Sequence, residues 1–132
     1  MRLRLAEAAK GDFSFGAVIA REGKLAATGR NSGIRTNDPT AHGKMVAIRN
    51  FCASRLAAEL KGATTGEPCS MCMGAILWSG FGRLVYAASI DELSTRIGQI
   101  MTPSKSLPEA APFETIDITG GVLAAEALAL FK

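Results

Sequence analysis

The sequence predicts an α/β protein, a sandwich of helices around a mixed β-sheet, and three observations lead to this fold class. The chain has 132 residues, which suits a single domain over 1–132. Hydrophobic residues make up 48% of it, enough for a core that needs no disulfide. A hairpin pattern comes first, and predicted strands then alternate with predicted helices. The sheet is therefore expected to contain both antiparallel and parallel pairs.

The first half of the chain contains two predicted helices and three predicted strands. In chain order, they are a helix over 2–10, strands over 15–21 and 25–29, a helix over 41–60 and a very short strand over 63–65. The turn Glu22-Gly23-Lys24 joins the first two strands into a hairpin. Apolar residues at helical spacing predict the long helix, which Thr40 is placed to cap and Lys61-Gly62 to end.

The second half continues the alternation. Its predicted elements are a helix over 71–78, a strand over 83–89, a short helix over 91–97, a loop over 102–112, a strand over 114–118 and a helix over 121–131. Pro68 precedes the first of these helices and Ser79-Gly80 ends it, while three prolines favour the loop. The last helix is apolar enough to pack on the sheet.

Composition and charge exclude several classes of protein. No stretch of 18 residues lacks a charged side chain, which excludes a transmembrane helix. No apolar signal segment follows Met1, so a cytoplasmic protein with no membrane partner is expected. The formal net charge is only +3, and the basic residues are not clustered with aromatic ones. A nucleic-acid partner is therefore not expected.

One histidine and two cysteines form a candidate metal site. His42 is the only histidine, and it falls in the first turn of a predicted helix; Cys69 and Cys72 fall at the start of another. Zinc accepts one imidazole and two thiolates and then keeps a fourth position for water, which is the catalytic arrangement. A thiol–disulfide pair is the alternative, but proline precedes Cys69, which is not typical of such pairs. The pattern therefore favours Zn²⁺.

The motifs around these residues resemble a known family. Residues 37–42 (NDPTAH) and 66–72 (GEPCSMC) are similar to the zinc-dependent cytidine and deoxycytidylate deaminase superfamily, whose motif is His-x-Glu followed by Pro-Cys-x-x-Cys. NDPTAH and residues 45–49 (MVAIR) are most similar to the guanine deaminase branch, with tRNA adenosine deaminases next. The resemblance implies a three-layer α/β/α sandwich with a five-stranded mixed sheet. It also implies hydrolytic removal of an amine from a small-molecule nucleobase or nucleoside, and a homodimer.

The sequence departs from the family at the catalytic position. Lys44 stands where the family has glutamate, the general acid/base. Lysine heads strongly prefer water, so the Lys44 side chain is expected to turn to solvent and leave the site without its proton carrier. Gly43 stands where alanine is common, and the central strand is about two residues short. A catalytically inactive zinc-binding protein of the deaminase fold is therefore an alternative to an active enzyme.

Three further residues carry smaller expectations. Asn31 resembles the asparagine that binds the base in guanine deaminases, with an ordinary loop asparagine as the alternative. Glu67 is expected to order its loop rather than to touch substrate. Trp78 is expected in the core or at a dimer contact. Deamination of adenosine in tRNA needs a basic surface, and the last predicted helix carries only the terminal lysine.

Overall fold

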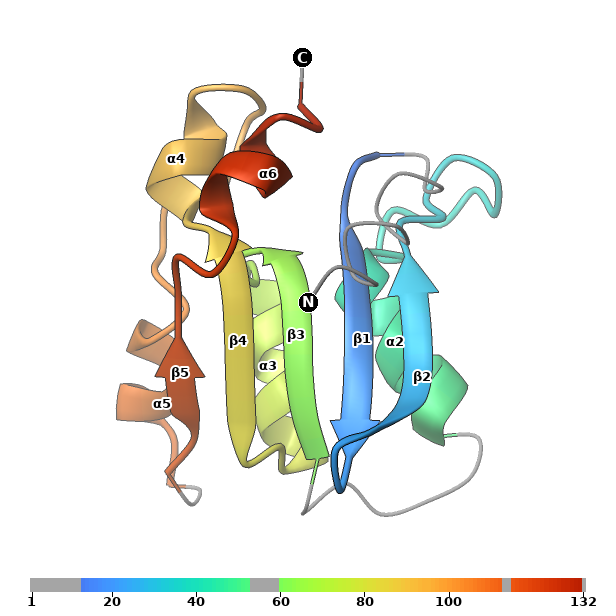
Figure 1. The fold of residues 1–132 in the computed structure, drawn as a ribbon, viewed down its shortest axis with the longest axis vertical. Coiled ribbons are helices and arrows are strands. Elements are labelled where there is room, and N and C mark those ends of the chain that lie inside the picture. Colours follow the sequence, from blue (N-terminus) through green and yellow to red (C-terminus); the bar gives the residue numbers. More distant parts are fainter. Residues whose placement is uncertain (1–12, 53–59, 113–114, 132) are drawn as a thin grey trace.

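The computed structural model describes residues 13–52, 60–112 and 115–131 (Figure 1). Its strands are β1 (Gly16–Arg21), β2 (Lys24–Arg30), β3 (Leu60–Gly66), β4 (Arg83–Ala88) and β5 (Asp117–Thr119). Its helices are α2 (Gly43–Cys52), α3 (Ser70–Ser79), α4 (Ile90–Ser94), α5 (Ser106–Ala110) and α6 (Ala124–Leu128). The helix predicted over 2–10 lies outside the described residues.

The five strands form one mixed sheet in the order β2-β1-β3-β4-β5. β1 pairs antiparallel with both β2 and β3, whereas β3, β4 and β5 run parallel. The predicted hairpin and the predicted mixed sheet are both confirmed. The carboxyl ends of β3 and β4 lie at the same edge, and the segments that follow them, which include Cys69 and α4, start there.

Helices lie on both sides of this sheet. α2 and α3 lie behind the strands in Figure 1, and α6 lies in front of the upper end of β4. Leu84 of β4 packs into the cluster that contains Ala47 of α2 and Ile76 of α3. Ala87, three residues later and so on the opposite face, packs against Ala127 of α6. The fold is an α/β sandwich around a five-stranded mixed sheet, as predicted.

Two glycines let α2 approach the sheet closely. A Cβ at Gly29 of β2 would lie 2.3 Å from the backbone nitrogen of Ala47, which no side chain allows. A Cβ at Gly43 would lie 3.1 Å from the carbonyl oxygen of Phe15, tighter than most real contacts. The absence of side chains at these positions therefore lets the first half of α2 lie against both β2 and the start of β1.

The structure corrects the predictions around β3. A very short strand over 63–65 was predicted, but β3 spans seven residues. Lys61 and Gly62, predicted to end a helix, pair with Ala20 and Ile19 of β1 and with β4 on the other side. Pairing with neighbours on both sides outweighs the local turn signal of Lys-Gly. Of the helix predicted over 41–60, the structure describes α2, and residues 53–59 lie outside the described part.

Other boundaries also differ from the predictions. α2 begins at Gly43 rather than at residue 41, and the Thr40 hydroxyl bonds to Asp38 instead of capping the helix. The loop predicted over 102–112 contains α5. α4 and α6 each have five residues and are shorter than the helices predicted over 91–97 and 121–131. β5 begins at Asp117, whereas the strand was predicted over 114–118. A capping box at Ser89 and Glu92 starts α4 one residue earlier than predicted.

Candidate functional site

The structure brings His42, Cys69 and Cys72 together. His42 directly precedes α2, and its carbonyl accepts the helix's early bond from Val46 N at 2.9 Å. Cys69 occupies the N-cap position of α3, and Cys72 lies in the first turn. The His42 Nδ1 atom lies 3.6 Å from each sulfur. The starts of two helices therefore converge on one point.

The three side chains fit a zinc ion in chemistry and in spacing. Their candidate ligand atoms all lie within 4.8 Å of one another. Tetrahedral zinc with ordinary Zn–N and Zn–S bonds separates nitrogen from sulfur by about 3.6 Å. The observed His42–sulfur separations have this value. One imidazole and two thiolates also match the donor set that zinc prefers.

The two sulfurs differ in their readiness to bind a cation. The contact with Cys72, followed by that with His42, lowers the pKa of Cys69 to about 3 despite burial. The same contact and burial raise the pKa of the Cys72 thiol. The contact therefore favours the thiolate form of Cys69 and the protonated form of Cys72. A bound metal displaces that proton, because only thiolates are good ligands.

A cleft of about 900 Å³ opens beside this cluster, and His42 and Cys69 line it. Three buried polar side chains form its floor: Asn31, Lys44 and Glu67. Phe13, Ile34 and Ile100 are exposed and form its rim. The metal cluster thus faces a cavity of the size that small organic ligands occupy.

Lys44 does not turn to solvent, so that expectation is wrong. Its side chain is only 5% exposed, and its Nζ lies 4.9 Å from the centroid of the Phe15 ring. The Phe15 ring packs in turn against Phe131, with centroids 4.9 Å apart. A cation over an aromatic face is attracted to it, and this offsets part of the lost hydration. Lys44 therefore remains at the floor of the cleft, close to the metal cluster.

Asn31 lies in the same cleft and is 6% exposed. Its backbone N–H donates to the Phe15 carbonyl at 3.1 Å, and its Oδ1 accepts from Gly33 N at 3.0 Å. These bonds fix the turn that follows β2. The structure thus places Asn31 with His42, on the lining where a base-binding side chain was expected.

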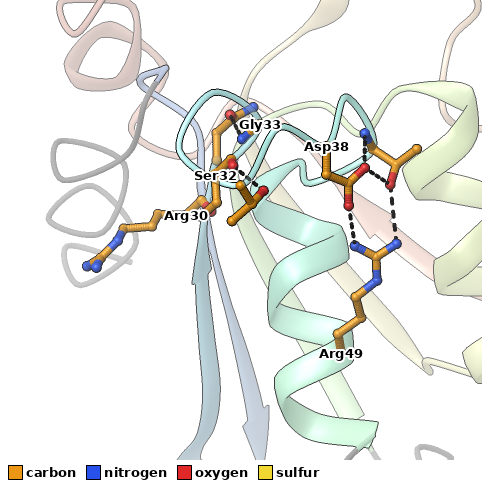
Figure 2. Close-up of polar contacts among 8 residues, drawn as sticks. Arg30, Ser32, Gly33, Asp38 and Arg49 are labelled. Carbon is orange, nitrogen blue, oxygen red and sulfur yellow. Dashed lines mark hydrogen bonds and ion pairs between the residues drawn. The ribbon is translucent and has the colours of Figure 1, made fainter.

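Asp38, which the sequence analysis did not single out, organises the loop before His42 (Figure 2). One carboxylate oxygen accepts from the backbone N–H of Thr40 at 2.9 Å and from its hydroxyl at 2.6 Å. Arg49 of α2 reaches the other oxygen at 3.5 Å. Thr40 and Arg49 together hold the pKa of Asp38 below its ordinary value. The Asp-Pro-Thr sequence is a turn signal that could have revealed this role.

Glu67 orders the polypeptide around the cleft, as expected. It is 7% exposed, and its Oε1 accepts from Ile90 N at 2.9 Å. Its Oε2 accepts from both the backbone N–H and the hydroxyl of Ser104, at 2.7 and 2.8 Å. Glu67 lies two residues before Cys69 in the chain. Its buried carboxylate thus connects the start of α4 and the segment before α5 to the loop that leads into α3. No local pattern in the sequence predicts these distant partners.

Trp78 lies on the surface of α3, where it is 81% exposed. The prediction that it belongs to the core is therefore wrong, whereas the alternative, a contact between two copies of the chain, remains a prediction. Within the described residues, the helices are all too short or too polar to cross a membrane.

Comparisons with known proteins agree with this geometry. A family model described as the cytidine and deoxycytidylate deaminase zinc-binding region matches residues 1–88. The chain is 44% identical over 77 residues to the guanine deaminase of Bacillus subtilis strain 168, a match that covers 56% of this chain and 49% of the relative. It is 35% identical over 130 residues to the tRNA-specific adenosine deaminase of Haemophilus influenzae, covering 94% of this chain and 73% of that protein.

A solved structure supports the fold. It comes from a study of A-to-I editing by tRNA:A34 deaminases at the wobble position of transfer RNA. Its TM-score is 0.83 at 26% identity, over 98% of this chain and 96% of the other. The chain therefore spans about half of its guanine deaminase relative and nearly all of this structural neighbour.

Proposed function

The chain belongs to the cytidine and deoxycytidylate deaminase family, and we propose that it is a zinc-dependent hydrolytic deaminase of a purine base, of the guanine type. The observation that supports this most is the convergence of His42, Cys69 and Cys72 at the wall of a cleft whose floor contains Asn31. A metal-binding set, an adjacent cavity and an amide at its floor are three of the parts that such a reaction needs, and a proton-carrying group is the fourth.

In this proposal, His42, Cys69 and Cys72 hold the zinc. A zinc ion held there would supply the Lewis acidity that activates a water for attack on the ring carbon that carries the amine. Asn31 offers its side-chain amide to the polar edge of the base. The Phe15 ring and the apolar rim exclude water from the ring faces of the substrate.

Lys44 limits the rate of the proposed reaction. The reaction needs a carboxylate at this position to take a proton and return it to the leaving amine. An ammonium has no lone pair with which to accept a proton. Because the Lys44 side chain is buried at the cleft floor, it occupies the place where a water could otherwise carry the proton. The chain with Lys44 is therefore expected to deaminate very slowly.

Adenosine in tRNA is the second candidate substrate. The tRNA-specific relative matches 94% of this chain, against 56% for the guanine deaminase. The guanine type is preferred because the match to guanine deaminase has the higher identity, 44% against 35%. Comparing ammonia release from guanine with inosine formation in a tRNA separates the two.

The deciding experiment combines zinc content with ammonia release for the unmodified chain and for Lys44→Glu. We expect about one zinc per chain in both, because Lys44 is not a ligand, and a gain of about 10²–10⁴ in turnover on a purine base for Lys44→Glu. Lys44→Ala is the control and should stay inactive. Zinc-loaded, folded Lys44→Glu with no activity on any base would contradict the proposal.

We also propose that the protein is cytoplasmic and forms a homodimer. Trp78 and the apolar α3 offer an exposed surface for a second copy. Light scattering should therefore give twice the chain mass of 13.8 kDa, and Trp78→Lys should shift it toward the monomer. A monomeric mass for the unmodified chain at micromolar concentration would contradict the dimer.

A further inference from the structure

The Phe15 ring separates the cleft from a second buried cluster, which is formed by Ala87, Ala88, Leu93, Ala127 and Phe131. The ring lines the cleft and also packs against Phe131, with centroids 4.9 Å apart and planes tilted by 60°. Tilted rings at this distance are a favourable arrangement of two aromatic side chains. Phe131 is 7% exposed and, among the described residues, is not part of the cleft lining. Phe131 therefore supports the cleft wall from behind.

The end of β3 holds the same ring on another side. A Cβ at Gly66 would lie 3.0 Å from Cε1 of Phe15 and 2.7 Å from Cδ1 of Leu93, so the two side chains fill the space that a larger residue would need. Leu93 belongs to the same buried cluster as Phe131. The space behind Phe15 is thus closely packed, and the ring has little room to move away from the cleft.

Two side-chain hydrogen bonds fix the residues that follow α6. The Arg96 Nη1 atom donates to the Phe131 carbonyl at 2.8 Å, and the Ser14 hydroxyl donates to the carbonyl of the preceding residue at 3.0 Å. Ser14 directly precedes Phe15, and Arg96 directly precedes Ile97, which also lines the cleft. The segment with Phe131 is therefore bonded next to two different parts of the cleft lining.

A wall that is already in place favours binding. If the Phe15 ring could retreat, a ligand in contact with it would have to order the ring on binding, and this ordering costs affinity. The metal cluster would be unchanged, because its ligands are His42, Cys69 and Cys72. Loss of the support behind Phe15 should therefore weaken ligand binding without changing the zinc content or the turnover of bound substrate.

We propose that Phe131 is a positioning residue for ligand binding, which holds the Phe15 ring in the cleft wall and thereby sets the affinity of the cleft for a purine base. The inference rests on the proposed function in taking a purine base as the ligand. It goes further because it assigns part of this affinity to a residue behind the wall, outside the cleft lining and the metal cluster.

Steady-state kinetics in the Lys44→Glu chain separates binding from chemistry. With 2,6-diaminopurine as the substrate, adding Phe131→Ala should raise KM at least about tenfold and leave kcat and zinc content unchanged. Leu128→Ala is the matched control, because Leu128 packs on the same buried cluster and lies outside the cleft lining, and it should keep the KM of Lys44→Glu. A KM that Phe131→Ala does not change, or that Leu128→Ala raises equally, would overturn the proposal.

Two milder variants keep the test decisive if Phe131→Ala does not fold. Phe131→Leu lacks the ring but fills much of the space, so KM should rise by a smaller factor. Arg96→Met removes the donor to the Phe131 carbonyl at an exposed position, and it should also raise KM. An unchanged KM in both folded variants would show that Phe131 does not position the ring.

Binding to the unmodified, zinc-loaded chain separates this inference from the deaminase proposal. Turnover in Lys44→Glu with a KM that ignores Phe131 refutes this inference alone. If zinc-loaded Lys44→Glu is inactive on every base, the deaminase proposal fails, and fluorescence titration with 2-aminopurine decides the inference. Binding at least about tenfold weaker in Phe131→Ala, or weaker in Phe131→Leu if only that variant folds, would then support it. Equal affinities, or no binding to the unmodified chain, would overturn it.

Discussion

Two walls of the cleft are built in different ways. The metal wall, formed by His42 and Cys69, comes from residues at the starts of α2 and α3. The loop wall, residues 97–100, follows α4 and is held by bonds that Glu67 makes to partners 23 and 37 residues away. Short motifs that can be recognised in the sequence specify the first wall, whereas hydrogen bonds that no local motif indicates specify the second. Substitutions in the metal wall should therefore change the zinc content of the protein. Substitutions that break the hydrogen bonds of the loop wall should change the free energy of unfolding.

The largest effect is expected at the metal wall. Cys72→Ser removes one of three protein ligands, and hydroxyl oxygen is a poor ligand for zinc. Zinc per chain, measured by elemental analysis after dialysis, should fall from about one to near zero. Cys52→Ser is the matched control, because Cys52 lies outside the two sequence motifs that contain His42, Cys69 and Cys72, and it should keep its zinc. Full zinc occupancy in Cys72→Ser would show that the metal is held elsewhere.

The next largest effect is expected at the loop wall. Glu67→Ala removes the acceptor of three hydrogen bonds and leaves buried donors at Ile90 and Ser104 without it. Hydrogen bonds to a charged group contribute about 1.5–3 kcal/mol each and are not additive, so a loss of roughly 3 kcal/mol in the free energy of unfolding is expected. Urea denaturation measures this loss, and hydrogen exchange should quicken over 97–104.

The same variant tests the separation of the two walls. The zinc content of folded Glu67→Ala should equal that of the unmodified chain, because Glu67 touches none of the three ligands in the bonds it makes. If Glu67→Ala lost its zinc as well as its protection from hydrogen exchange over 97–104, the Glu67 carboxylate would support both walls.

The sequence predicted the parts of the site that depend on short segments. The cysteine pair, the single histidine and the proline-flanked helix start predicted the metal cluster, and the glycine turn predicted the hairpin. The burial of Lys44 could not be predicted, because it depends on Phe15 and through it on Phe131, more than 80 residues away in the chain. The length of β3 also escaped prediction, because it is set by pairing with β1 and β4.

A smaller effect is expected from Ser104→Ala. The hydroxyl donates one of the two bonds that reach Glu67 Oε2, and the backbone N–H of the same residue keeps the other. The free energy of unfolding should fall by about 1 kcal/mol, roughly a third of the Glu67→Ala effect. Urea denaturation of both single variants and of the double variant measures the coupling. If the double variant loses the sum of both values, Ser104 stabilises the loop without acting through Glu67.

The smallest effect is expected at Asp38, where the loop before His42 meets solvent. Bonds from Thr40, and then the charge of Arg49, hold the pKa of Asp38 below 3.8, so folding favours the ionised carboxylate. A group with a lowered folded pKa stabilises the fold above its unfolded pKa, and this contribution is lost as the pH falls through the folded value. Asp38→Asn should therefore be less stable than the unmodified chain at pH 7, and the difference should shrink steadily as the pH is lowered below about 4. Both chains carry the same zinc ligands, so the acid release of zinc contributes equally and cancels in the difference. Urea denaturation across this range checks the prediction, and a difference that stays constant with pH would mean that Asp38 acts through the shape of the loop rather than through its charge.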